Sequence, residues 1–175
     1  FRVSVSLGNL ANLYTARGHL SEAIPLWERS IAILNKIPKT ERSDEMVAKV
    51  LTALGSIYTI QGRYAEAEAL LKTALETAEE ALGVNHPGVV ETLISLAAYF
   101  HSQDRIDEEE TPLKRALAIR EQTLGPEHWY VAQVLGHLAR LYMGQARFDE
   151  AEDMIYRATM ILESSPAPGQ YPISA

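Results

Sequence analysis

Hydrophobic positions along this chain follow one pattern, Leu-x-x-Leu-(Ala/Gly)-x-x-(Tyr/Phe), which occurs four times. The copies begin at Leu7, Leu51, Leu93 and Leu135, so successive copies are 44, 42 and 42 residues apart. Side chains at these spacings share one face of an α-helix. A repeat of this length predicts stacked helical hairpins.

Each copy is followed by a short break and then by a second helical pattern. The breaks contain Gly18 and Gly62 in the first two copies, where the end of a helix requires a positive φ. The second helices are predicted to begin near residues 21, 65, 107 and 149 and to end before Pro38, Gly83, Gly125 and Pro166. The sequence therefore predicts eight helices in four helix-turn-helix units.

Packing positions inside the helices can also be assigned. Small residues such as Ala67 indicate close helix contacts, and Trp27 is expected in the core. The third copy differs, because it has Glu109 at the small position, Asp104 in place of glycine, and Pro112 about one turn into its second helix. Two interpretations stay open, a drifted repeat with a bent second helix or a hinge or lateral docking site.

The second copy carries a family resemblance. Leu54-Gly55-x-x-Tyr58 followed by Gly62, Tyr64, Ala67, Leu71 and Ala74 resembles the tetratricopeptide repeat, whose usual period is about 34 residues. The additional residues here fall at the end of the second helix, where segments 80–87 and 121–128 resemble the linker of the long variety found in kinesin light chains.

The resemblance implies a fold and a division of the chain. It covers about residues 4–164 and implies an all-α, right-handed α-solenoid of four tetratricopeptide repeats. The array is expected to span residues 1–165, with repeats at about 4–43, 44–86, 87–128 and 129–164. Residues 166–175 are rich in proline and are predicted to be a tail or linker.

The two ends of the chain bear on its partners. An array of this kind normally closes with a polar-faced capping helix, and no such helix is evident after the fourth repeat. The last helix is therefore expected to keep an apolar flank, covered by the tail, by further repeats or another domain, or by a second copy through self-association. The chain begins with Phe1 and enters the first repeat directly, so we interpret it as a fragment of a longer protein.

Composition narrows the range of partners. The chain has 175 residues and a formal net charge of −7 at pH 7, which opposes nucleic-acid binding. No apolar run is long enough to cross a bilayer, so no membrane partner is expected. The sequence has no cysteine, which excludes disulfides and thiolate chemistry but leaves the compartment open. A cytoplasmic location is our default expectation.

Motifs for catalysis or metal binding are not apparent. There is no phosphate-binding glycine loop, no His-Glu-x-x-His and no Gly-x-Ser-x-Gly. The histidines are scattered, and His86 and His128 belong to the linkers, where we expect them to cap helices. The run Glu108–Glu110 is expected to be a solvated helix face rather than a pair of general acids. We therefore predict no catalytic residues, no metal, no cofactor and no enzymatic activity.

Tetratricopeptide arrays resemble one another in lining a concave face with the first helix of each pair. The resemblance implies a groove for a protein or peptide partner, which should be roomy because most of its residues are small or neutral. The candidate partner-binding residues are Asn9, Asn12, Lys49, Thr52, Ser56, Ser95, His101, His137 and Arg140. The two asparagines can supply hydrogen bonds to the backbone of an extended peptide.

Two comparisons within the family restrict the partner. Asn9 matches the second asparagine of the Asn-Asn-Leu-Ala motif that holds cargo peptides in kinesin light chains, but Gly8 replaces the first. Chaperone-binding arrays clamp a terminal carboxylate with lysine, asparagine and arginine, and of those positions only Asn12 matches. Recognition of chaperone tails is therefore not expected, and kinesin-type cargo binding is only partly supported.

One charged cluster is predicted in the groove. His101, His137 and Arg140 lie on neighbouring first helices. They are expected either to bind one acidic group, more tightly as the pH falls through the histidine range, or to remain solvated.

The sequence as a whole favours a protein-protein interaction scaffold that binds through its concave groove. One alternative stays open, a regulatory or sensor region of a larger multidomain enzyme or signalling protein, in which the array holds the catalytic part inactive. The fold alone does not separate the two, because such arrays serve many unrelated pathways.

Overall fold

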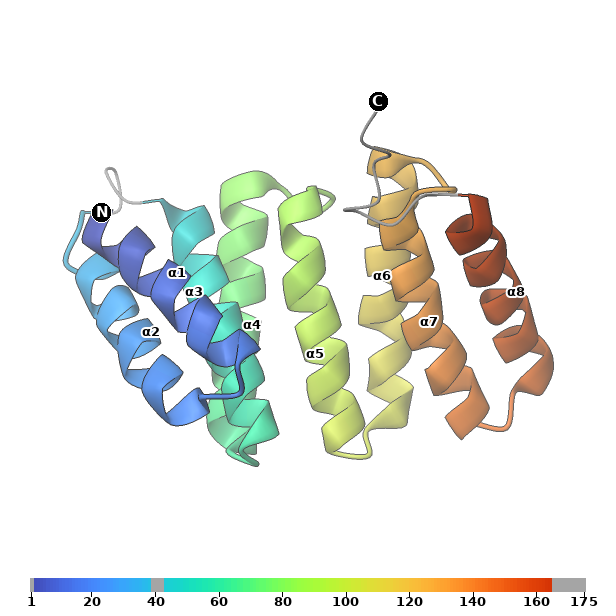
Figure 1. The fold of residues 1–175 in the computed structure, drawn as a ribbon, viewed down its shortest axis with the longest axis horizontal. Coiled ribbons are helices and arrows are strands. Elements are labelled where there is room, and N and C mark those ends of the chain that lie inside the picture. The colour runs from blue at the N-terminus through green and yellow to red at the C-terminus, as the bar shows by residue number, and fades with distance from the viewer. Residues whose placement is uncertain (1, 39–42, 165–175) are drawn as a thin grey trace, which may run out of the picture. The chain divides into compact units, whose positions relative to one another are not determined.

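The computed structural model describes residues 2–38 and 43–164 (Figure 1). The helices are α1 (Arg2–Ala16), α2 (Leu20–Leu34), α3 (Asp44–Ile60), α4 (Tyr64–Leu82), α5 (Val90–Ser102), α6 (Ile106–Leu124), α7 (Trp129–Gly144) and α8 (Phe148–Ser164), with the short 3-10 helix η1 (Pro87–Val89) before α5. The eight predicted α-helices are confirmed for this part of the chain. The second helices begin at 20, 64, 106 and 148, one residue earlier than predicted. The predicted tail, 166–175, lies outside the described residues.

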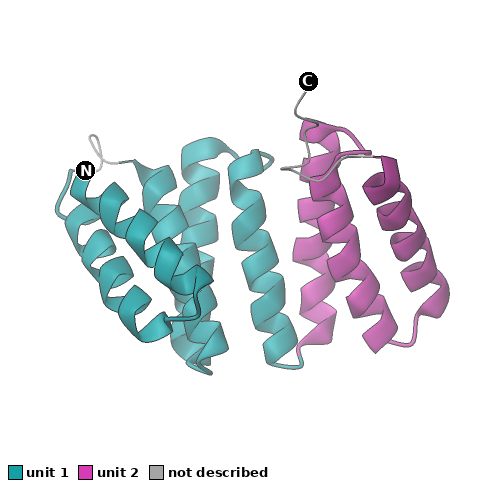
Figure 2. Ribbon diagram, viewed as in Figure 1, with its two compact units in different colours: residues 1–104 teal, residues 105–175 magenta. Residues whose placement is uncertain are grey.

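The chain divides into two compact units, residues 1–104 and 105–175 (Figure 2). Unit 1 contains α1 to α5, and unit 2 contains α6 to α8. The division falls in the turn between α5 and α6, so the two helices of the predicted third repeat belong to different units. The repeat boundaries and the hinge stay predictions.

Backbone geometry at the hairpin turns explains where each first helix ends. Gly18 and Gly62 have φ values of 75° and 74°, as predicted. Asp104 and Ala146 follow α5 and α7 with φ values of 55° and 57°. The turn therefore keeps a residue with positive φ even where that residue is not glycine. This conformation costs a residue with a side chain about 1–2 kcal/mol.

The repeated leucines and alanines form the core of each unit. In unit 1, Leu54, Leu71 and Leu96 from three successive helices belong to one buried cluster, which also contains Trp27, as predicted. In unit 2, Leu135 of α7 packs with Ile161 of α8. Each hairpin therefore buries apolar surface both internally and, within a unit, against its neighbour.

The second helix of the predicted third repeat presents only part of the acidic face that its sequence suggested, because Glu108 is exposed but its two neighbours are not. α6 continues through Pro112 without a break. Glu109 has no exposed surface and Glu110 is mostly buried. The expectation of a solvated face is therefore wrong for these two residues, because they form ion pairs with Arg140 and Arg147, respectively.

Gly55 shows how tightly α3 and α4 pack. A Cβ at this position would lie 2.6 Å from Cγ of Leu71, which is fully buried. We expect Gly55→Ala to lower the free energy of unfolding by about 1–3 kcal/mol, because the crowding outweighs the gain in helix propensity. Urea unfolding followed by circular dichroism measures the change.

Gly136 provides a matched control. It lies inside α7, also a first helix, and a Cβ there would meet no described heavy atom within 4 Å. We expect Gly136→Ala to raise the free energy of unfolding by about 0.5–1 kcal/mol. A stabilising effect of both substitutions would contradict the close packing of α3 on α4.

Candidate partner-binding site

A cavity on unit 1 brings together several of the predicted groove residues. It has a volume of about 360 Å³ and is lined by Asn12, Trp27, Ala48, Lys49, Thr52, Ala53, Gly88, Glu91, Thr92 and Ser95. The lining residues come from α1, α2, α3, η1 and α5. Asn12, Lys49, Thr52 and Ser95 are therefore placed around one space, and their role in binding a partner stays a prediction. We call it the unit 1 cavity.

Two hydroxyl pairs join α3 to α5 beside this cavity. Oγ1 of Thr52 lies 2.8 Å from Oγ1 of Thr92, and Oγ of Ser56 lies 2.9 Å from Oγ of Ser95. Short side chains allow the two helices to approach, and the hydroxyls of the buried Thr52 and Thr92 satisfy each other where water is largely excluded. The small residues predicted to make the groove roomy thus also hold its helices together.

Trp27, which the sequence placed only in the core, also forms an apolar wall of the unit 1 cavity. Its ring approaches α1 closely, since a Cβ at Gly8 would lie 3.2 Å from Cζ3 of the indole. The indole nitrogen is buried and makes no hydrogen bond within the described residues. The sequence signal for this contact was Gly8, because a glycine inside a helix often marks a close approach of another group.

Polar groups of both signs surround the unit 1 cavity. Lys49 is exposed and pairs with Glu45 one turn earlier on α3. Glu91 lies in the first turn of α5, and Asn12 is exposed on α1. One cation, one anion and one amide suit a polar main chain better than a ligand of high net charge.

The remaining candidate residues lie outside this cavity. Asn9 is exposed on α1, and His101 is exposed near the end of α5 in unit 1. His137 and Arg140 lie on α7 in unit 2. The guanidinium of Arg140 is 3.6 Å from Oε1 of the buried Glu109, so this cation already faces an internal carboxylate. The cluster with His101 stays a prediction.

The linker histidines cap helices, as predicted. Nδ1 of His86 accepts a hydrogen bond from the amide of Gly88 at 3.0 Å, and Nδ1 of His128 accepts one from Tyr130 at 3.2 Å. Nδ1 of each histidine therefore takes part in a hydrogen bond within the fold.

Across residues 2–38 and 43–164, no group of three or more acidic or histidine side chains is placed to hold a metal ion.

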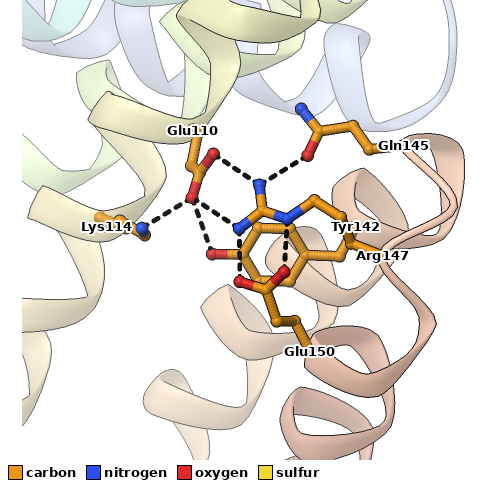
Figure 3. Close-up of polar contacts among 6 residues, drawn as sticks. All are labelled: Glu110, Lys114, Tyr142, Gln145, Arg147 and Glu150. Carbon is orange, nitrogen blue, oxygen red and sulfur yellow. Dashed lines mark hydrogen bonds and ion pairs between the residues drawn. The ribbon is translucent and has the colours of Figure 1, made fainter.

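A polar cluster in unit 2 joins α6 to α7 and the turn after it (Figure 3). Glu110 accepts hydrogen bonds from Arg147 at 2.8 Å and Tyr142 at 3.0 Å, and it pairs with Lys114 at 2.6 Å. Arg147 also lies over the ring of Tyr142 and pairs with Glu150. The hydrogen bond from Arg147, followed by those from Lys114 and Tyr142, lowers the pKa of Glu110 to about 2.

Unit 1 contains the same kind of contact between consecutive hairpins. Tyr58 of α3 donates to Glu28 of α2 at 2.9 Å, and Tyr99 of α5 donates to Glu68 of α4 at 3.1 Å. With Tyr142 and its acceptor in unit 2, three first helices bond a glutamate of the preceding second helix. We call this the tyrosine–glutamate contact.

These hairpins, their spacing and their turns define an all-α solenoid of helical repeats. One family model of the tetratricopeptide repeat matches residues 46–122, and a second matches residues 3–37 and 131–159. Together the two matches cover most of the sequence. The chain belongs to the tetratricopeptide repeat family.

Solved structures share this fold over nearly the whole chain. BtubC (BKLC) from P. vanneervenii is 23% identical, with a TM-score of 0.83 over 97% of this chain and 67% of its own. Two structures of a putative kinesin light chain with nearly identical TPR-like repeats, from Podosopora anserina, are 26% and 25% identical. Their TM-scores are 0.71 and 0.69, over 92% and 94% of this chain and 75% and 77% of theirs. Among curated proteins, no sequence matches.

These comparisons confirm the long, kinesin-light-chain-like repeat type. Repeats of this family generally mediate protein-protein interactions, and the fold is typically a non-catalytic scaffold. Within residues 2–38 and 43–164, none of the helices combines the length and the hydropathy that a membrane span requires. The cytoplasmic location stays a prediction.

The cluster around Glu110 predicts a pH-dependent stability. Because the pKa falls from 4.5 when unfolded to about 2 when folded, the carboxylate stabilises the fold above about pH 4.5, and this contribution is lost as the pH falls through about 2. We expect Glu110→Gln to lower the free energy of unfolding by about 2–3 kcal/mol at neutral pH, and by progressively less below about pH 4.5. Urea unfolding over this pH range measures the difference.

Asp153 supplies the control, since it is exposed on α8 and its replacement changes the charge equally. Asp153→Asn should not reproduce the loss at neutral pH. If the deficit of Glu110→Gln were the same at every pH, the role assigned to the ionised carboxylate would be wrong.

Proposed function

We propose that this protein is an interaction scaffold that binds an extended peptide segment of its partner at the unit 1 cavity. The observation that carries the proposal is the convergence of three first helices, α1, α3 and α5, on one space of about 360 Å³. This volume lies at the lower end of typical ligand pockets, so it suits one or two side chains rather than a folded surface.

The lining favours an apolar anchor side chain. Trp27, Ala48 and Ala53 supply apolar walls; Ala53 is partly exposed, whereas Trp27 and Ala48 are each 4% exposed. An aliphatic or aromatic side chain of the peptide would remove this surface from water. The site is therefore expected to select a motif with a central hydrophobic residue.

The rim favours a peptide backbone beside that anchor. The amide of Asn12 can donate to a peptide carbonyl and accept from a peptide N–H. Lys49 already pairs with Glu45, and Glu91 adds a negative charge, which disfavours a ligand whose affinity rests on a terminal carboxylate. A peptide held by its backbone and one apolar side chain also agrees with the sequence, which has a net charge of −7 and matches the carboxylate clamp of chaperone-binding arrays only at Asn12.

A peptide-display selection on residues 1–175 tests the proposal. We expect enrichment of one motif with an apolar anchor, and we expect Asn12→Ala to weaken its binding about tenfold, the loss of one or two hydrogen bonds. Fluorescence anisotropy of the selected peptide measures the affinity.

Asn9→Ala is the matched control, because Asn9 is exposed on the same helix and does not line the cavity. Its affinity should equal that of the parent chain. A loss in Asn9→Ala alone would point instead to a kinesin-type contact with the peptide backbone. If no motif were enriched, the peptide proposal would fail, and the sensor alternative would gain support.

A further inference from the structure

The linker between α4 and α5 is held together by hydrogen bonds of His86. Its amide donates to the carbonyl of Gly83 at 3.1 Å, and its carbonyl accepts from the amide of Val89 at 3.1 Å. Its side chain adds a further bond, because Nδ1 accepts from the amide of Gly88 at 3.0 Å. His86 thus connects the end of α4 to η1, the short helix that leads into α5.

The segment that His86 holds forms part of the wall of the unit 1 cavity. Gly88 of η1 lines this cavity, and Glu91 and Thr92 line it from the first turn of α5. Gly88 also packs closely on the end of α4, since a Cβ there would lie 2.6 Å from Cδ1 of Leu82. The bond between Gly88 and His86 therefore fixes backbone that borders the proposed peptide site.

This bond requires one protonation state of the imidazole. A backbone amide always donates, so Nδ1 of His86 is unprotonated and the neutral ring carries its proton on Nε2. A protonated ring has an N–H on both nitrogens and offers no acceptor to Gly88. Histidine is the side chain that normally changes charge between about pH 5 and 8. The bond is therefore of a kind that is lost on mild acidification.

Charged groups near this linker are mostly acidic. The helices packed on η1 are α4 and α5, and they carry carboxylates in the adjoining turns: Glu79, Glu80 and Glu91. From α3 comes Glu45, whose pKa is lowered mainly by its hydrogen bond to Lys49 and to a lesser extent by His86. These carboxylates attract an imidazolium, but that attraction does not restore an acceptor to the amide of Gly88.

We propose that His86 is a positioning residue of the unit 1 cavity and makes peptide binding depend on pH; this inference rests on the proposed function. The neutral ring holds Gly88 and the first turn of α5 in the conformation that binds the peptide. Protonation releases the amide of Gly88, so a smaller fraction of molecules is competent to bind. Affinity therefore falls as the pH decreases through the histidine range. Because the coupling is reciprocal, a bound peptide disfavours protonation of His86 by the same factor.

Fluorescence anisotropy between about pH 5 and 8 tests this inference. The probe is the selected peptide with blocked termini and no ionisable side chain, so that only the protein titrates. For the parent chain we expect the dissociation constant to rise about fivefold from pH 8 to pH 5, as for the loss of one hydrogen bond. Circular dichroism checks that the chain stays folded over this range.

Two substitutions of His86 separate positioning from a merely structural role. His86→Asn supplies a side-chain oxygen that caps without titrating, so it should bind like the parent at pH 8 and keep that affinity at pH 5. His86→Ala has no acceptor at any pH and should bind about fivefold more weakly throughout. Rescue by asparagine with a flat pH profile is the result that a general loss of stability does not produce.

His128 provides the matched control. It makes the same bonds in the linker before α7, where Nδ1 accepts from Tyr130 at 3.2 Å, but it does not line the unit 1 cavity and lies in unit 2. His128→Asn should keep the pH dependence of the parent chain. His101→Gln, which removes the exposed histidine of α5, should keep it too.

The possible failures are distinguishable. If the parent chain binds the peptide with the same affinity at pH 5 and 8, or if His86→Asn keeps the pH dependence, the role of His86 is refuted and the proposed function stands. A pH dependence that disappears in His128→Asn would also refute it. If no peptide binds even at pH 8, the proposed function fails, and this inference fails with it.

Discussion

Each helix of this protein has two apolar sides, and only one of them can be buried by the other helix of its own hairpin. The second side requires a neighbouring hairpin. Leu71 of α4 is fully buried in a cluster that contains both Leu54 of α3, from its own hairpin, and Leu96 of α5, from the next. Burying such a side chain contributes about 1.5–3 kcal/mol. Contacts between hairpins therefore carry much of the stability.

Polar groups give these apolar contacts a defined register. Leucine and alanine surfaces alone tolerate small shifts, whereas a tyrosine hydroxyl that must reach a glutamate fixes where one helix lies on the next. Glu110 shows the effect most clearly, because its carboxylate contacts Lys114 of α6, Tyr142 of α7 and Arg147 of the turn after α7. On the side of the unit 1 cavity, the pair of Thr52 and Thr92 plays a similar part. Stability and the shape of the binding surface thus depend on the same inter-hairpin contacts.

Much of the fold was predictable from the sequence because its determinants are local. The leucine pattern and the breaks between its copies located the start of each second helix to within one residue, since periodicity and positive φ act over a single turn. The burial of Glu109 and Glu110 was not predictable in this way, because their partners lie about thirty residues away in the chain and an acidic run usually marks a solvated face. The residues that line the unit 1 cavity show the same difference. Helix periodicity was enough to predict Asn12 and Lys49. It did not predict the wall formed by Trp27, because that wall depends on how closely α1 approaches α2.

The unit 1 cavity depends on the contact of α1 with α2. Asn12 of α1 and Trp27 of α2 line the cavity together, and a Cβ at Gly8 of α1 would lie 3.2 Å from Cζ3 of the indole. A change that pushed these two helices apart would therefore move Asn12 away from the residues of α3 and α5 that line the same space. The peptide site that we propose thus depends on the same close packing that holds the first hairpin together.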